Sequence, residues 1–512
     1  MTSASLMQSF YESLARGVGS VDRRSVYVFV GSGTVVVAMT VAGALLVMRR
    51  VSASVGTAAP TKEQLEQEHP QEKCAIFRHL PSLATKLAWR SLGASESTPI
   101  HKCEMPNGIE FYVKREDLIS NKYGGNKVRT LQHQLAVCEA RRERGDKACK
   151  QLVPIGSGGS NQIIATVVHA RELGWDNEGG CAINPCWFDS DKPDLDNTLN
   201  MLSTFSFPIG FSFNWGMKPG FLEAVGAIWG AITQDVFLPL MLGGNCPVGV
   251  LGQVGGVLEL AEQIHRRESP DPNRIYLAIG SGCTASGLIL GVVLTQHLGL
   301  NTFQHSDFKI VVCNVHHGMA LGDRLFGFHV NPFFGYMPLT IQHSVFEACN
   351  TLKRLGGPDL TSECRSFIQN HVELRSREDV VGKYGGHSDI SREAAQHYDD
   401  TGVMTDYLTG KKEKEIWVCG HFVAKALQPL VSDLEKAKSQ SLAPSYMLWQ
   451  TKSAVQPLGP LMNEWEKMQM QNETVKKWAN EGKAESKLRA GKVSTKDGTA
   501  DDYRSIMTTI DS

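Results

Sequence analysis

Three short segments of the sequence combine glycine with side chains that can do chemistry. The first, KYGGNKVR at residues 122–129, places Lys127 at the start of an expected helix. Asn126 precedes it, at the cap position where helices favour asparagine. The positive end of the helix dipole disfavours a cation there by roughly 0.3–1 kcal/mol. Lys127 is therefore either an ordinary surface lysine in a poor place or a lysine whose amine is used without its charge.

The other two segments join an expected strand to an expected helix. LVPIGSGGSNQ ends at Ser160, Asn161 and Gln162, and RIYLAIGSGCTASG contains the loop from Gly280 to Thr284. Small residues let backbone N–H groups approach an anion at a helix start, so the second loop predicts a phosphate site. Each loop alone is also typical of a tight connection. Neither a G-x-G-x-x-G pattern nor a G-K-[ST] ending supports a nucleotide site, which would leave Lys127 incidental.

The elements around these loops indicate an α/β architecture. Apolar runs such as GIEFYVK, KQLVPIG, RIYLAIG and KIVVCNV have the character of buried strands, and helical stretches separate them. Repetition of strand, glycine loop and helix predicts open parallel sheets with crossover helices. With 512 residues, the chain is long enough for two or three domains.

Charge and cysteine usage exclude several classes of partner. Lys+Arg 52 against Asp+Glu 53 gives a formal net charge of -1, and there is no basic run with interleaved aromatic residues. We therefore expect no nucleic acid partner. The 12 cysteines are scattered singly, without zinc-site spacing, which predicts no metal site and a reducing compartment such as the cytosol or mitochondrion.

The amino-terminal region has a different composition. Residues 25–48 carry no charge, and arginines bracket them at positions 23, 24, 49 and 50. A helix that rises about 1.5 Å per residue would cross a hydrocarbon core of about 30 Å over this length, which predicts a single-pass membrane protein. A buried helix or a targeting presequence are the alternatives. The expected divisions are an amino-terminal segment at 1–24, the transmembrane helix at 25–48, a polar tether at 49–73, a catalytic region at 74–460 and a charged helical or disordered tail at 461–512.

Taken together and in this order, the motifs resemble a known family. VKREDLISNKYGGNKVRTLQ, GSGGSNQ, AIGSGCTASGL and LGGNCPVGVLGQVGGVLELAEQI are similar to segments of pyridoxal-phosphate enzymes with the tryptophan-synthase-β-like fold (fold type II). Within this group, the sequence most resembles 1-aminocyclopropane-1-carboxylate deaminases and D-cysteine desulfhydrases. The resemblance covers roughly residues 74–460. It implies a two-lobed α/β fold, pyridoxal 5′-phosphate as the cofactor and a small amino acid as the substrate.

The resemblance also implies roles for individual residues. Lys127 would hold the cofactor as a Schiff base, since a helix start and a desolvated pocket both favour the neutral, nucleophilic amine. Asn161 would contact the cofactor's 3-hydroxyl, and Ser160 and Gln162 would hold the substrate carboxylate. Thr451 would face the pyridine nitrogen. The phosphate would lie in the loop formed by Gly280, Ser281, Gly282, Cys283 and Thr284.

The sequence departs from the family pattern where two tyrosines are expected near the substrate. Ser388 and Leu408 occupy those positions, and Lys452-Ser453 replaces a Gly-Gly pair. Tyr384 and Tyr407 are the nearby phenols, and Tyr407 is the candidate for an acid or base, although a shift of one residue can turn a side chain to the opposite face. Lys127, once released, is a second candidate base.

Two functions remain open from the sequence. The first is a pyridoxal-phosphate-dependent lyase or deaminase that acts on a small amino acid, in a chain for which a homodimer is one allowed assembly. The second is a membrane-anchored homologue that binds the cofactor but is catalytically weak or silent, for which the replaced tyrosines are the argument.

Overall fold

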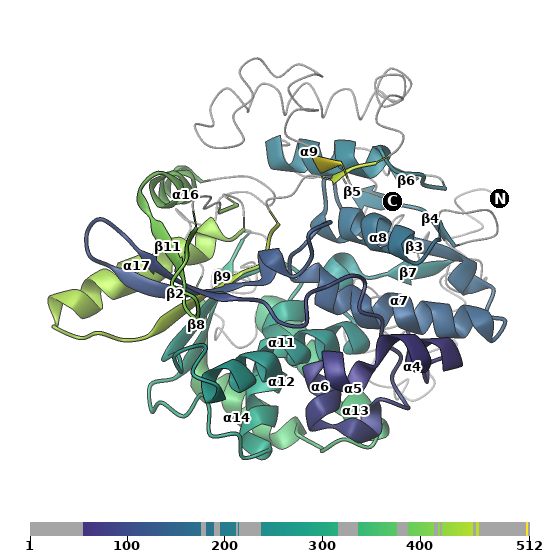
Figure 1. Ribbon diagram of the computed structural model, residues 1–512, viewed down its shortest axis with the longest axis horizontal. Coiled ribbons are helices and arrows are strands. Elements are labelled where there is room, and N and C mark those ends of the chain that lie inside the picture. The colour runs from purple at the N-terminus through teal and green to yellow at the C-terminus, as the bar shows by residue number, and fades with distance from the viewer. Residues whose placement is uncertain are drawn as a thin grey trace, which may run out of the picture.

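Two sheets and the helices that cover them make up the described part of the protein, in which the predicted α/β class with parallel strands is confirmed (Figure 1). The computed structural model describes residues 55–175, 181–188, 195–210, 213–214, 237–315, 336–375, 388–413, 418–419, 422–453, 457–459 and 508–509.

The larger sheet has eight strands with a parallel centre and an antiparallel edge. Neighbouring strands from β10 to β2 pair in parallel, whereas β1, β11 and β12 pair antiparallel. The carboxyl ends of β2, β8 and β13 consequently lie along one edge, which is where open α/β sheets bind ligands. The order is β10 (Val372–Arg375), β9 (Lys309–Asn314), β8 (Arg274–Ile279), β13 (Tyr446–Gln450), β2 (Glu110–Arg115), β1 (Ile100–Glu104), β11 (Val403–Asp406) and β12 (Lys412–Glu413).

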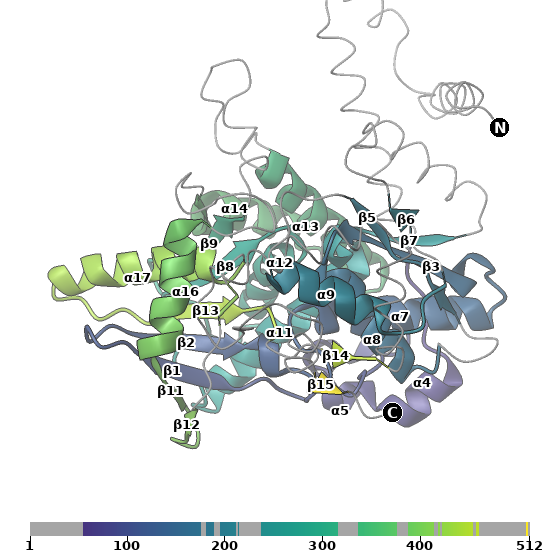
Figure 2. The same ribbon diagram turned by 90° about the horizontal axis from the view of Figure 1, so that it is seen from above.

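The smaller sheet is parallel throughout. Its strands are β4 (Ala182–Ile183), β3 (Gln151–Ser157), β5 (Cys186–Phe188) and β6 (Phe213–Asn214), and β7 (Leu238–Leu240) also pairs with β3. Figure 2 shows α8 (Asn161–Glu172) and α9 (Leu195–Phe205) beside this sheet, away from α16 (Asp389–Thr401) and α17 (Ala424–Ser439) at the larger one. A short separate pair joins β14 (Pro457–Leu458) to β15 (Thr508–Thr509).

Both faces of the larger sheet are buried, and successive residues of a strand pack into the cores on opposite faces. On β8, Ile275 and Leu277 pack into the core formed with α11 and α12, whereas Tyr276 packs into the core formed with α16 and α17. Strands buried on both faces are expected to be apolar, as the residues IYLAI that follow Arg274 in β8 are. The helices on the first face are α7 (Lys127–Glu143), α11 (Pro247–His265), α12 (Cys283–His297), α13 (Tyr336–Arg354) and α14 (Thr361–His371).

The stretch expected as a polar tether contains folded structure. Helices α4 (Lys62–Glu68) and α5 (Pro70–Lys73) lie within it and lead directly into α6 (Ala75–His79). Gln64 is buried and donates to the backbone oxygen of Ala136 and to Glu139 on α7. The expected boundary at residue 74 therefore lies inside a packed segment. The composition of this stretch is polar, but some of its polar side chains form hydrogen bonds to α7.

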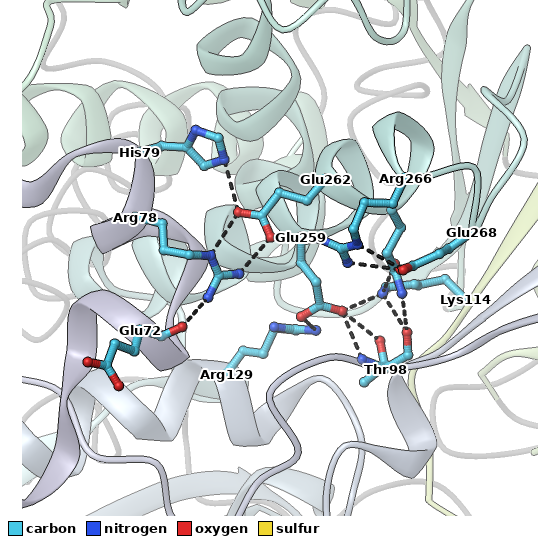
Figure 3. A network of polar contacts seen from close by, with 11 residues as sticks. Glu72, Arg78, His79, Thr98, Lys114, Arg129, Glu259, Glu262, Arg266 and Glu268 are labelled. Carbon is cyan, nitrogen blue, oxygen red and sulfur yellow. Dashed lines mark hydrogen bonds and ion pairs between the residues drawn. The ribbon is translucent and has the colours of Figure 1, made fainter. Parts of the chain in front are cut away.

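A buried ion network joins α7 to α11 and to the larger sheet (Figure 3). Arg129 on α7 contacts Glu116 at 2.6 Å and Glu259 on α11 at 2.8 Å, and Glu259 also pairs with Lys114 on β2. Burial alone would raise the pKa of Glu259, but Arg129 and Lys114 hold it at about 2. Thr98 donates its backbone N–H to Glu259 at 2.9 Å. Arg129 lies in the first turn of α7, two residues after Lys127, so this network anchors the start of that helix.

The predicted membrane-spanning helix is corrected. Within the ranges that the structure describes, every helix is too short or too polar to cross a membrane, and residues 25–48 lie outside those ranges. The fold class was wrong in including that helix, and the single-pass membrane location was wrong with it. The sequence satisfied a length and charge criterion, but its glycines and β-branched residues are weak helix formers, so hydropathy alone did not establish a span.

We expect Arg129→Met to destabilise the protein by about 3–5 kcal/mol, because it leaves two buried carboxylates without their shared cation. The measurement is the free energy of unfolding from urea denaturation. Lys62→Met is the matched control, since Lys62 pairs with Glu66 at 3.6 Å on the surface and should change stability by less than about 1 kcal/mol. Equal effects of the two substitutions would contradict a structural role for the network.

Candidate functional site

Lys127 is the first residue of α7 and lies between loops from both sheets. Its Nζ donates to the carbonyl oxygen of Gly243 at 3.1 Å, and this is its one hydrogen-bond acceptor among the described residues. Desolvation lowers the pKa of Lys127, and the nearby thiol of Cys283 opposes that shift only in part. Burial raises the pKa of Cys283 to about 12, so that thiol is neutral near pH 7. The surroundings therefore favour the neutral amine of Lys127.

The two glycines before Lys127 allow the chain to pass between two other backbones. A side chain at Gly124 would collide with the backbone oxygen of Asp117. Gly125 has φ +99°, and a Cβ there would lie 2.5 Å from the backbone oxygen of Thr451. Asn126 donates its backbone N–H to that same oxygen at 3.1 Å. The start of α7 is thus held against the segment that follows β13.

Asn126 occupies the cap position, but its side chain does not cap the helix. Its Nδ2 instead donates to Thr284 Oγ1 at 2.6 Å, across to the start of α12. Gln253 on α11 donates to the backbone oxygen of Asn126. The expected capping bond is replaced by a bond that ties the first motif to the third.

The loop after β8 brings a helix amino end to Lys127. Gly282 is the residue before α12, with φ +87°, and no side chain caps this helix. Cys283 and Thr284 begin α12, and Ser281 offers its backbone oxygen to Asn245 Nδ2 at 2.6 Å. An uncapped helix start with a glycine loop presents backbone N–H groups and the positive end of the dipole to an anion.

A fourth loop, at Leu242–Gly244, completes the surroundings of Lys127. A Cβ on Gly243 would collide with Ser281 and lie 3.3 Å from Lys127 Nζ, so only glycine fits between them. A Cβ on Gly244 would lie 3.0 Å from Oε1 of Gln162. In the sequence, LGGNCP stood out only as part of a resemblance. Two adjacent glycines between a strand and a helix were the signal for its place in the site.

The second motif forms the start of α8. Ser160 is the cap residue, and its Oγ accepts the backbone N–H of Gln162 at 3.3 Å. Gln162 is buried, and its Oε1 has no hydrogen-bond partner among the described residues. Asn161 Oδ1 accepts from Tyr123 Oη at 3.0 Å and from Asn200 Nδ2 at 2.7 Å. These bonds tie the start of α8 to the loop before α7.

Sequence reasoning missed three members of the Asn161 cluster. Tyr123 and Asn200 are fully buried, and Lys452 is also buried, with its Nζ 3.3 Å from Tyr123 Oη and 3.2 Å from Asn200 Oδ1. Tyr123 stands in the first motif, and Lys452 was noted only as a departure from the family pattern. Asn200 on α9 offered no signal in the sequence.

The remaining sequence candidates have different surroundings. The ring of Tyr407 is partly exposed and packs against the ring of Tyr112, with centroids 5.7 Å apart. Ser388 caps α16, and Leu408 is exposed. Tyr384 lies outside the described residues. In contrast to Lys127, Asn161 and the Gly280–Thr284 loop, Tyr407 has no described contact that links it to this cluster.

The chain is similar in sequence and in fold to several known proteins. No family model matches the chain. The chain is 30% identical over 190 residues to a Pyrococcus abyssi protein provisionally named 1-aminocyclopropane-1-carboxylate deaminase, which covers 37% of this chain and 53% of that protein. It is 26% identical over 230 residues to the mitochondrial bifunctional D-cysteine desulfhydrase/1-aminocyclopropane-1-carboxylate deaminase of Arabidopsis thaliana (43% and 54%). It is 28% identical over 196 residues to D-cysteine desulfhydrase of Salmonella paratyphi C (37% and 54%).

These matches cover about half the length of the curated relatives. A solved structure of an ACC deaminase homologue superposes with a TM-score of 0.50 and 20% identity, over 74% of this chain and 94% of that chain. The described fold is therefore that of the ACC deaminase homologue, and the resemblance to the deaminase and desulfhydrase group is confirmed.

We expect Gly125→Ala to destabilise the protein more than Gly145→Ala, although both glycines have positive φ. The strain of a left-handed residue costs about 1–2 kcal/mol at either position. At Gly125, the added methyl group also meets the Thr451 backbone, which should cost a further 1–3 kcal/mol. Nothing lies within 4 Å of a Cβ at Gly145. Urea denaturation measures both, and equal losses would contradict the close approach of these two segments.

Proposed function

We propose that the protein is a pyridoxal-phosphate-dependent lyase or deaminase that acts on a small amino acid. The observation that carries this proposal is the desolvated amine of Lys127, which faces a glycine loop and the uncapped start of α12. The names of the relatives support a substrate such as D-cysteine or 1-aminocyclopropane-1-carboxylate.

The residues present fit this cofactor in three respects. A cofactor aldehyde requires a neutral amine, and burial lowers the pKa of Lys127. A phosphate requires N–H donors, which the Gly280–Gly282 loop and the first turn of α12 present. A ring hydroxyl requires a donor or acceptor at its edge, and Asn161 is held in place for this by Tyr123 and Asn200. Thr451 follows β13 beside Gly125, in keeping with the proposed position near the ring nitrogen.

The mechanism depends on what Lys127 does before and after the substrate arrives. Bound pyridoxal phosphate would act as an electron sink for negative charge at the substrate carbon. Lys127 would hold this group through its neutral amine, because an ammonium has no lone pair for attack. When it is not bonded to the cofactor, Lys127 Nζ would be the group that accepts or returns a proton at the substrate carbon. The single residue would then serve as both anchor and base.

The start of α8 would orient the substrate. Its dipole and the hydroxyl and amide of Ser160 and Gln162 suit a carboxylate, although Ser160 Oγ accepts the backbone N–H of Gln162 in the structure. Gln162 Oε1 lies near Gly244 and has no partner among the described residues, so turning the amide over would present its NH2 group beside the loop that contacts Lys127. We assign the carboxylate-binding role to these two residues.

A cofactor-binding but catalytically weak protein is the second candidate. Its specific support is the surroundings of Tyr407, whose phenol ring packs on Tyr112 and is partly exposed. Ser388, which caps α16, and the exposed Leu408 stand at the two positions where the family pattern has tyrosines, so both of those phenols are missing.

We expect Lys127→Ala to abolish covalent labelling by pyridoxal 5′-phosphate and borohydride, because the variant lacks the attacking amine. Peptide mass spectrometry of the labelled protein locates the modified lysine. Lys122→Ala is the matched control, since Lys122 is in the same motif but pairs with Glu172 at 2.7 Å, and it should leave the labelling intact. A label on Lys452 or on another lysine in wild-type protein would show that the assignment is wrong.

We also expect slow release of ammonia or sulfide from 1-aminocyclopropane-1-carboxylate and D-cysteine, since loss of one acid–base group typically costs about 10²–10⁴ in rate. Tyr407→Phe should have the same turnover as wild type, because the contacts of Tyr407 are with Tyr112. A variant that loses turnover with an unchanged cofactor spectrum would instead assign proton transfer to Tyr407.

A further inference from the structure

Lys452 is a buried lysine next to the candidate site that the proposed mechanism does not use. It follows Thr451 after β13, and its backbone forms an antiparallel bridge with Gly125. The residue is 3% exposed, and its Nζ lies over the ring of Tyr123, 5.4 Å from the centroid. The family pattern has glycine at this position, so this lysine is a feature of the chain rather than of the resemblance.

Lys452 is the donor in its hydrogen bonds to Tyr123 and Asn200. A lysine side chain offers its N–H groups as donors to nearby oxygen atoms. Lys452 Nζ therefore donates to Tyr123 Oη at 3.3 Å and to Asn200 Oδ1 at 3.2 Å. Tyr123 Oη accepts this bond and donates its proton to Asn161 Oδ1 at 3.0 Å, which is closer than the other acceptor, Asn200 Oδ1 at 3.4 Å.

Asn200 provides a second path of hydrogen bonds from Lys452 to Asn161. Its Oδ1 accepts from Lys452, which assigns the opposite end of the amide as NH2. That Nδ2 donates to Asn161 Oδ1 at 2.7 Å and to the backbone oxygen of Gly159 at 2.9 Å. Both routes from Lys452 thus end on one atom, Oδ1 of Asn161.

The two routes determine which end of the Asn161 amide is presented to the site. With Oδ1 occupied by two donors, the NH2 group is the remaining end of the side chain. Asn161 is consequently a donor at the start of α8, where the positive end of the helix dipole also favours an anion. A flipped amide would turn its NH2 toward the Nδ2 donor of Asn200 and lose that bond.

We propose that Lys452 is a positioning residue that acts through Tyr123 and Asn200 to fix Asn161 as a hydrogen-bond donor to a negatively charged oxygen of the bound cofactor. The inference rests on the proposed function, since it requires the cofactor in this site. It deepens that function by naming the group that sets the orientation of Asn161.

A double-mutant cycle tests this proposal, with the dissociation constant of pyridoxal 5′-phosphate as the readout. Lys452→Met keeps the length of the side chain and removes the donor. Lys452→Met and Asn161→Ala should each weaken binding about ten- to a hundredfold, the usual effect of losing a bond to a charged group. The double variant should bind no more weakly than Asn161→Ala alone, because residues that act through one another are not additive.

A purely structural role for Lys452 would give a different result. Its effect would then add to that of Asn161→Ala in the double variant, and this outcome would overturn the proposal. Unchanged binding by Lys452→Met would overturn it as well. If Lys452→Met does not fold, Tyr123→Phe replaces it in the same cycle, since it removes the phenol oxygen and keeps the ring.

The proposed function and the role of Lys452 would be contradicted by different results. Wild-type protein that does not bind pyridoxal 5′-phosphate would contradict the proposed function and this inference together. Wild-type protein that binds it, with a label on Lys127 but additive losses in the cycle, would contradict only the role of Lys452.

Discussion

The amine of Lys127 is held at the first residue of α7, where burial and the helix dipole both act against its charged form. In the described structure it has one acceptor, the carbonyl oxygen of Gly243, and no carboxylate that would restore the charge. Such a position is unfavourable for folding, so the surrounding structure must enforce it. The glycine loops and the buried ion network are the parts of the fold that do this.

Two sets of contacts keep α7 in place. On one side, Gly124 and Gly125 let the chain pass against the backbones of Asp117 and Thr451 without side chains between them. On the other, Arg129 joins Glu116 and Glu259 in a region shielded from water. Loss of Arg129 would remove the cation that these two buried carboxylates share and leave Glu259 with Lys114 as its cation. The position of the amine is therefore coupled to the packing of α7 against α11.

The sequence predicted the chemical motifs better than their wider surroundings. Local patterns were enough to predict parallel strands such as RIYLAI and the helix starts at Lys127 and Asn161, because period and glycine placement are local properties. The Asn126 side chain was expected to cap α7 but bonds to Thr284, 158 residues away in the chain. Asn200 and Lys452 could not be assigned for the same reason, since their contacts exist only after distant segments have packed. The helices at residues 62–73 were hidden by a polar composition, and hydropathy misled at residues 25–48.

The pH dependence of reductive methylation measures directly whether the fold lowers the pKa of the Lys127 amine. Limited methylation with formaldehyde and a borohydride donor, followed by peptide mass spectrometry, gives the rate for each lysine as pH rises. Lys62, whose side chain is 87% exposed, is the internal reference. We expect the rate at Lys127 to reach its plateau at a lower pH than the rate at Lys62. A plateau at the same or a higher pH would contradict it.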